Sequence, residues 1–236
     1  MLGQLDAVRF IQIFIVQGFM SFLYFFMAYL ILRRGTKRLN LNLTAFYLSI
    51  GIAGVINMIY APMQIFFGPS HQIVYMLHFI TYYLYCISLI FLLLFILIIL
   101  KSDRVISLKV EILSISLFGL LLLGLWFIPG GIQFNTYDAK PHWNWAFGIY
   151  SFIICSMVII PTLYYSLVLY RKFDFEELQK KWRYFILGES AFFFLYYGTT
   201  LSNMLNDPGF RTLWSILGIF SLVLLSCIYL GVGKQL

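Results

Sequence analysis

The sequence predicts an all-α integral membrane protein, a single domain over residues 1–236 built as a bundle of seven transmembrane helices. Hydrophobic residues make up 62% of the chain and charged residues 11%, whereas a soluble domain carries about 25% charged residues. So few polar side chains do not cover the surface of a globule in water. Seven apolar runs are each long enough to cross a bilayer core, which takes about 20 helical residues. We expect helices because a helix satisfies its own backbone hydrogen bonds in lipid.

Charged or turn-forming residues separate the seven predicted spans. Arg33 and Arg34 end the first span, and Pro129 follows the fourth. The first three spans and the last three have similar spacing, which indicates a 3+1+3 plan with two parallel repeats. The predicted spans cover residues 10–32, 43–67, 72–100, 110–128, 145–170, 182–205 and 211–232.

Basic residues gather in the loops on one side of the predicted bundle. The positive-inside rule places this side in the cytoplasm, so the N-terminus is outside and the C-terminus inside. The same rule explains the net charge of +7 without a nucleic-acid partner. We expect a multi-pass protein of the cell membrane, in contact with membrane lipids. The cytoplasmic side carries Arg33, Arg34, Lys37, Arg38, Lys101, Arg104, Lys109, Arg171, Lys172, Lys180, Lys181, Arg183 and Lys234, and the outer side carries Arg9, Lys140 and Arg211.

The motifs of several enzyme and cofactor classes are missing from the sequence. Cys86, Cys155 and Cys227 all lie in apolar runs, so they are expected to pack as small apolar groups, and their spacing fits no zinc site. The seventh span has no lysine to attach retinal, and no hydrolase or metalloprotease motif occurs. We therefore expect no catalytic residues, no metal and no cofactor.

Polar and aromatic residues from four spans are predicted at a similar depth in the outer half of the membrane. They would line a pocket that opens to the outside, although hydrogen bonds between helices would explain the same residues without a pocket. Aromatic residues form 20% of the chain, so the pocket would suit a small apolar or amphipathic ligand. The candidate ligand-binding residues are Gln17, Asn57, Gln64, His78, Tyr82, Thr200 and Asn203.

Glu189 is the only acidic residue predicted well inside a span. It lies about two helical turns above the start of the sixth span, on the cytoplasmic side. A carboxylate in lipid is costly, so Glu189 is expected to face the bundle or to be protonated. Two interpretations stay open: an intramembrane switch or proton site, and a hydrogen-bonded carboxyl with a structural role.

Two loops have local sequence patterns of their own. In the outer loop 129–144, Gly130 and Gly131 precede alternating apolar residues, which predicts either a short hairpin over the bundle or an unstructured loop. In the inner loop, Asp174 and Glu177 have the spacing of a capping box, and Glu177 and Lys181 form a favourable i,i+4 pair. The sixth helix is thus expected to extend below the membrane. The segment 171–183 would contact a cytoplasmic signalling protein or be a solvated extension.

Residues 179–188, QKKWRYFILG, place a basic inner loop directly before an apolar helix with an early glycine. Together with the start of the second span, residues 42–47, this segment resembles the seven-transmembrane N-terminal sensor module of prokaryotic histidine kinases. The resemblance implies that a bound ligand shifts the helices and that the change reaches the cytoplasm. Such modules normally feed a cytoplasmic signalling domain, and here the sequence reaches Leu236 without a kinase domain.

Three functions are compatible with the sequence. The first is a sensor or receptor-like module that binds its ligand in the outer pocket and signals to a cytoplasmic partner. The second is a small-solute transporter or channel, which predicts a water path from Asn57 and His78 to Glu189. The third is a non-catalytic subunit of a membrane complex, which predicts a tightly packed bundle without a central cavity. An oligomer is compatible with all three.

Overall fold

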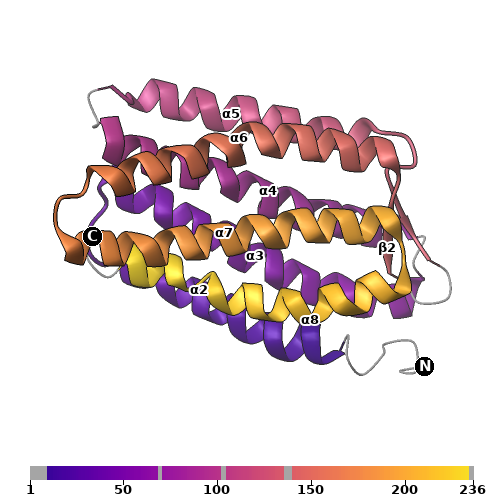
Figure 1. Ribbon diagram of the computed structural model, residues 1–236. Coiled ribbons are helices and arrows are strands. Elements are labelled where there is room, and N and C mark those ends of the chain that lie inside the picture. The colour runs from indigo at the N-terminus through magenta and orange to yellow at the C-terminus, as the bar shows by residue number, and fades with distance from the viewer. Residues whose placement is uncertain (1–9, 69–70, 102–104, 136–139, 234–236) are drawn as a thin grey trace.

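The computed structural model describes residues 10–68, 71–101, 105–135 and 140–233 and confirms the predicted all-helical bundle (Figure 1). Long helices run side by side along one axis, and a two-stranded hairpin lies at one end of them. In chain order the elements are η2 (Ile11–Gln17), α2 (Gly18–Leu32), α3 (Arg38–Phe67), α4 (Gln72–Lys101), α5 (Leu108–Leu123), η3 (Gly124–Phe127), β1 (Ile132–Phe134), β2 (Pro141–Trp143), α6 (Trp145–Lys172), α7 (Glu176–Leu205), α8 (Pro208–Leu224) and η4 (Tyr229–Gly233).

Six helical segments among the described residues are long and apolar enough to cross a membrane, so the chain is a multi-pass membrane protein. The sixth predicted span lies in α7, which has the length, at 30 residues, but is more polar than the others. A seventh span, the orientation and the 3+1+3 repeat therefore stay predictions. Three cations used to predict the orientation, Arg9, Arg104 and Lys234, lie outside the described residues.

The interior of the bundle is apolar, and so is much of its surface. Leu92 and Phe95 of α4 are fully buried, and this helix lies between α3 and α6. At the surface, by contrast, Phe22, Leu113 and Phe220 each expose about two thirds of their area (65–67%). Such large exposed side chains would be costly in water but have no such cost against lipid.

The loop 129–144 forms the predicted hairpin rather than an unstructured loop. β1 pairs antiparallel with β2, and Ile132 lies opposite Trp143. Gly130 has a φ of +61°, a left-handed conformation that glycine adopts without the strain of a side chain. Ile132 and Trp143 are both buried, so one face of the hairpin packs on the end of the bundle.

The start of α7 differs from the predicted capping box. The residue that precedes the helix is Phe175, which makes no side-chain cap hydrogen bond. The prediction that Asp174 caps the helix is wrong, because this residue lies one position too early. Glu177 and Lys181 do form the predicted ion pair, at 2.5 Å. The hydrogen bond from Lys181, and then its charge, lower the pKa of Glu177.

The last predicted span is interrupted. After α8, the Ser226 amide donates to the Val223 carbonyl at 3.1 Å, one residue short of the regular α-helical partner. The carbonyl of Leu222 instead accepts a hydrogen bond from the Tyr24 hydroxyl of α2, at 3.0 Å. The chain then continues as the π-helical turn η4. A residue of the first helix thus stabilises a break in the last one.

Candidate functional site

A cavity of about 530 Å³ lies at the hairpin end of the bundle. Its walls come from the first helix, α3, α4, α7 and α8, and the hairpin forms its roof. Its volume is typical of a small-molecule site. Five of the seven predicted ligand-binding residues line the cavity: Gln17, Asn57, His78, Tyr82 and Asn203.

One wall of the cavity is a chain of amide and phenol groups. The Asn57 side-chain amide donates to the Gln17 carbonyl oxygen at 2.5 Å. The Gln17 amide in turn donates to the Tyr85 hydroxyl at 3.0 Å. Three separate helices therefore hold one another at this depth. The sequence left two explanations for these polar residues, a pocket and hydrogen bonds between helices. Both apply here, because the same side chains bond to one another and line the cavity.

The roof of the cavity is anchored by Trp143 of β2, which is 1% exposed. Its indole N–H donates to Nε2 of His78 at 3.3 Å, and Nδ1 of His78 lies 3.0 Å from the Tyr60 hydroxyl. An indole N–H only donates, so Nε2 of neutral His78 accepts and its Nδ1–H donates to Tyr60. The hairpin is thus hydrogen-bonded to α4 through a histidine of the cavity wall.

Next to the cavity wall, around Tyr82, lies a buried cluster of hydroxyl groups. The Tyr82 hydroxyl contacts the hydroxyls of Ser151 and Thr200, and Ser151 lies 2.6 Å from the Tyr196 hydroxyl. Thr200 does not line the cavity, although it was predicted to. It is fully buried, and its hydroxyl lies 3.5 Å from that of Tyr82. Gln64, also predicted, is buried and likewise does not line the cavity.

Two cations line the cavity near its roof. Arg211, in the first turn of α8, is 8% exposed, and its guanidinium donates to the Pro141 carbonyl of β2 at 2.6 Å. Lys140 precedes the same strand. In the sequence, both residues indicated only the orientation. Their place at the site was not predicted, because the roof is built by a contact between β2 and α8, which lie about 70 residues apart.

Glu189 is completely buried in the other half of the bundle. The Ser166 hydroxyl of α6 donates to one carboxyl oxygen at 2.9 Å. The carbonyl of the same serine accepts from the Trp182 indole at 2.8 Å. Glu189 does not line the cavity at the hairpin end. It occupies a second polar position on α7, the helix that also contributes Asn203 to the cavity wall.

A second buried carboxylate, that of Glu111 in α5, was not predicted from the sequence. It accepts two hydrogen bonds from the Arg38 guanidinium, at 2.8 and 2.5 Å, and one from the Asn42 amide at 2.6 Å. Glu111 lies at the second position of the predicted span 110–128, so it was not counted among acidic residues well inside a span. Its partners come from α3, and nothing local in the sequence indicates the pairing.

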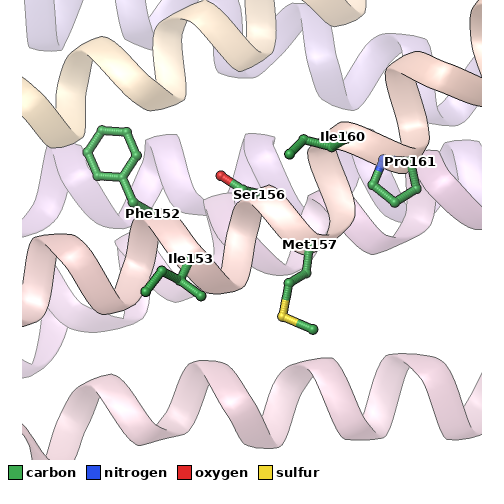
Figure 2. A pocket seen from close by; sticks show the side chains of 6 residues that line it. All are labelled: Phe152, Ile153, Ser156, Met157, Ile160 and Pro161. Atoms are coloured by element: carbon green, nitrogen blue, oxygen red, sulfur yellow. The ribbon is translucent and has the colours of Figure 1, made fainter.

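A hollow of about 590 Å³ lies on the outer surface of α6 beside Pro161 (Figure 2). Ile153 and Met157, which project to the same side of the helix, are about 60% exposed (59% and 63%). The single hydroxyl that lines the hollow belongs to Ser156, and it bonds to the Tyr197 hydroxyl at 2.7 Å. With apolar walls and no convergent polar groups, the hollow resembles a lipid-facing surface rather than a ligand site.

Comparisons with known proteins leave the site to be interpreted from its own geometry. No family model, no curated protein and no solved structure matches the chain. Among the described residues, no group of three or more His, Cys, Asp or Glu side chains is placed to hold a metal ion. What the cavity at the hairpin end offers instead is aromatic surface, amide and hydroxyl groups, and two cations.

Proposed function

We propose that this chain is a sensor or receptor-like membrane module that binds a small apolar or amphipathic ligand in the outer cavity. The observation that carries the proposal is the position of α7. Thr199, Ser202 and Asn203 of this helix line the cavity, and the same helix continues without interruption to Glu176. Its 30 residues span about 45 Å. A ligand that displaces the cavity wall would therefore move the opposite end of α7.

The cytoplasmic partner is proposed to contact residues 171–183. This segment includes the end of α6, the turn and the start of α7, where Lys172, Phe175 and Lys180 are accessible. A ligand transmits a signal only if it binds two arrangements of the helices with different affinity. Side-chain hydrogen bonds such as Ser151 to Tyr196 join α6 to α7, so we expect the two arrangements to differ in how these helices pack.

Two features favour the sensor over the alternatives. A cavity of about 530 Å³ does not fit the tightly packed bundle expected of a purely structural subunit. A transporter predicts a path from the cavity to Glu189, yet Glu189 does not line the cavity. Transport of a small solute is the second candidate function. It predicts solute flux into proteoliposomes that is lost in Glu189→Gln.

Filling the cavity is expected to abolish ligand binding. Gly218 lines the cavity, and a Cβ built there meets only the Leu195 side chain, at 3.6 Å. We expect Gly218→Leu to weaken binding at least tenfold, because the new side chain occupies the ligand's volume. Small aromatic alcohols, with the non-fluorescent 4-nitrophenol as the first probe, are tested by the quenching of tryptophan fluorescence, since Trp143 and Trp214 line the same cavity.

The control is Ile153→Phe, which enlarges an apolar side chain in the lipid-facing hollow on α6 instead of in the cavity (Figure 2). Binding in this variant is expected to equal that of the wild type. If Gly218→Leu bound every active probe as tightly as Ile153→Phe, the outer cavity would not be the ligand site.

The proposed orientation places the hairpin outside the cell and the α6–α7 turn in the cytoplasm, with α7 crossing the membrane in addition to the six apolar segments. In Figure 1, η2 begins near the hairpin and η4 ends at the opposite end of the bundle, as an odd number of crossings requires. In a cysteine-free background, we expect a membrane-impermeant maleimide to label Gln133→Cys on intact cells and Lys172→Cys only after permeabilisation. Both positions are exposed. Equal labelling of both on intact cells would overturn the orientation.

A further inference from the structure

The two buried glutamates of this protein have opposite surroundings. Glu111 is ion-paired to Arg38 and also bonded to Asn42. Glu189 is 0% exposed, accepts one hydrogen bond from Ser166, and its second oxygen has no partner within the described structure. One carboxyl group therefore has a cation that favours its charged form, and the other does not.

Among the described residues, the elements packed around Glu189 place no cation in an ion pair with it. From α6 comes Ser166. From the last span, Ile228 and the backbone of Cys227 pack against the neighbouring Gly188. None of the ion pairs within the described residues involves Glu189. Aromatic pairs flank Glu189 along α7. One turn before it, Phe185 packs against Phe95, and one turn after it, Phe192 packs against Phe46.

The titratable groups on these neighbouring elements do not bond to Glu189 either. Tyr47 of α3 and Cys227 of the last span have no hydrogen bond to it in the described structure. An ionised carboxylate in such a place would lose its hydration without any compensating charge, which is among the costliest arrangements in a protein. The neutral acid avoids most of this cost, and its O–H supplies the donor that a carboxylate lacks.

We propose that Glu189 is a proton-binding site, protonated while α6 and α7 are packed together and deprotonated when they separate. On separation the carboxyl O–H bond breaks, the electron pair stays on the carboxylate, and the proton passes to water on the cytoplasmic side. The partners fit a proton better than a metal ion. Glu189 and the hydroxyl of Ser166 offer too few oxygens for a cation such as Ca²⁺, which takes six to eight.

An aromatic cluster closes the cytoplasmic side of this site. The Trp182 ring stacks on the Phe185 ring, with 4.4 Å between the ring centroids, and meets the Phe173 ring edge to face, with 5.7 Å between the centroids. Trp182 also donates to the carbonyl of Ser166, whose hydroxyl holds Glu189. A movement of α7 that frees Trp182 would therefore admit water and release the serine together. Proton release and helix movement are linked through these two residues.

Infrared spectroscopy of the purified full chain in detergent tests the proton site directly. At neutral pH we expect the wild type to show the C=O stretching band of a protonated carboxylic acid. The band is expected to disappear in Glu189→Gln and to remain in Glu111→Gln, the matched control. Absence of the band from the wild type, or its persistence in Glu189→Gln, would overturn the proposal.

Two further measurements keep the test decisive if Glu189→Gln does not fold. Ser166→Ala removes the hydrogen bond to the carboxyl group, so it is expected to shift the band, and an unshifted band would contradict the site. In thermal unfolding, a proton held only by the folded state makes wild-type stability fall as pH rises. We expect a loss of about 5–10 °C between about pH 5 and pH 8, and a pH-independent melting temperature would contradict the site. Neither result depends on whether the outer cavity binds a ligand.

Discussion

Gly188→Val is expected to lower the free energy of unfolding by about 3 kcal/mol or to prevent folding, because the position has no room for a side chain. A Cβ at Gly188 would lie 2.6 Å from the backbone nitrogen of Ile228. Gly231 faces α7 in the same way, with a Cβ 2.6 Å from the backbone nitrogen of Phe185. Two glycines thus let α7 and the last span meet backbone to backbone.

Backbone atoms cannot rotate away as a flexible side chain does, so a new side chain at Gly188 must separate the two helices. The contact lies at the interruption between α8 and η4, where Ile228 is fully buried. Thermal unfolding of the purified variant and the yield of folded protein measure the effect. Gly218→Ala is the control, since its Cβ has ordinary contact distance to Leu195. Equal stability of the two variants would contradict the close packing.

Features that depend on local composition were predictable from the sequence. Apolar runs become helices because lipid requires satisfied backbone groups, and Gly130 with Gly131 indicated the turn that leads into the hairpin. Polar residues inside apolar runs, such as Asn57 and His78, turn inward because lipid does not solvate them. The predicted pocket residues therefore gather in one half of the bundle, and most of them line the cavity.

Features that depend on contacts distant in sequence were not predictable from one chain. Trp143 anchors the roof because the hairpin folds back over α4, a contact between residues 65 positions apart. The last span is interrupted at Ser226, where no glycine or proline in the sequence predicts a break. The residue that stabilises this break, Tyr24, belongs to the first helix. The predicted helix cap at Asp174 was wrong by one residue, because the residue that precedes α7 is Phe175.

Arg38→Met is expected to lower the free energy of unfolding by about 3 kcal/mol, near the lower end of the range for breaking a buried ion pair. The variant leaves the Glu111 carboxylate, whose side chain is 10% exposed, with only the Asn42 amide as a partner. The value is not higher because 24% of the Arg38 side chain is exposed, so water reaches the cavity that the change creates.

A double-mutant cycle separates this ion pair from simple packing. In Arg38→Met/Glu111→Leu no buried charge is left without a partner, so the double variant is expected to be more stable than Arg38→Met alone. Chemical or thermal unfolding in detergent gives the four free energies. Additive losses would mean that α3 and α5 are held together by shape alone. A double variant restored toward the wild type would show that the cost comes from the stranded carboxylate, the charge state that Glu189 avoids by keeping its proton.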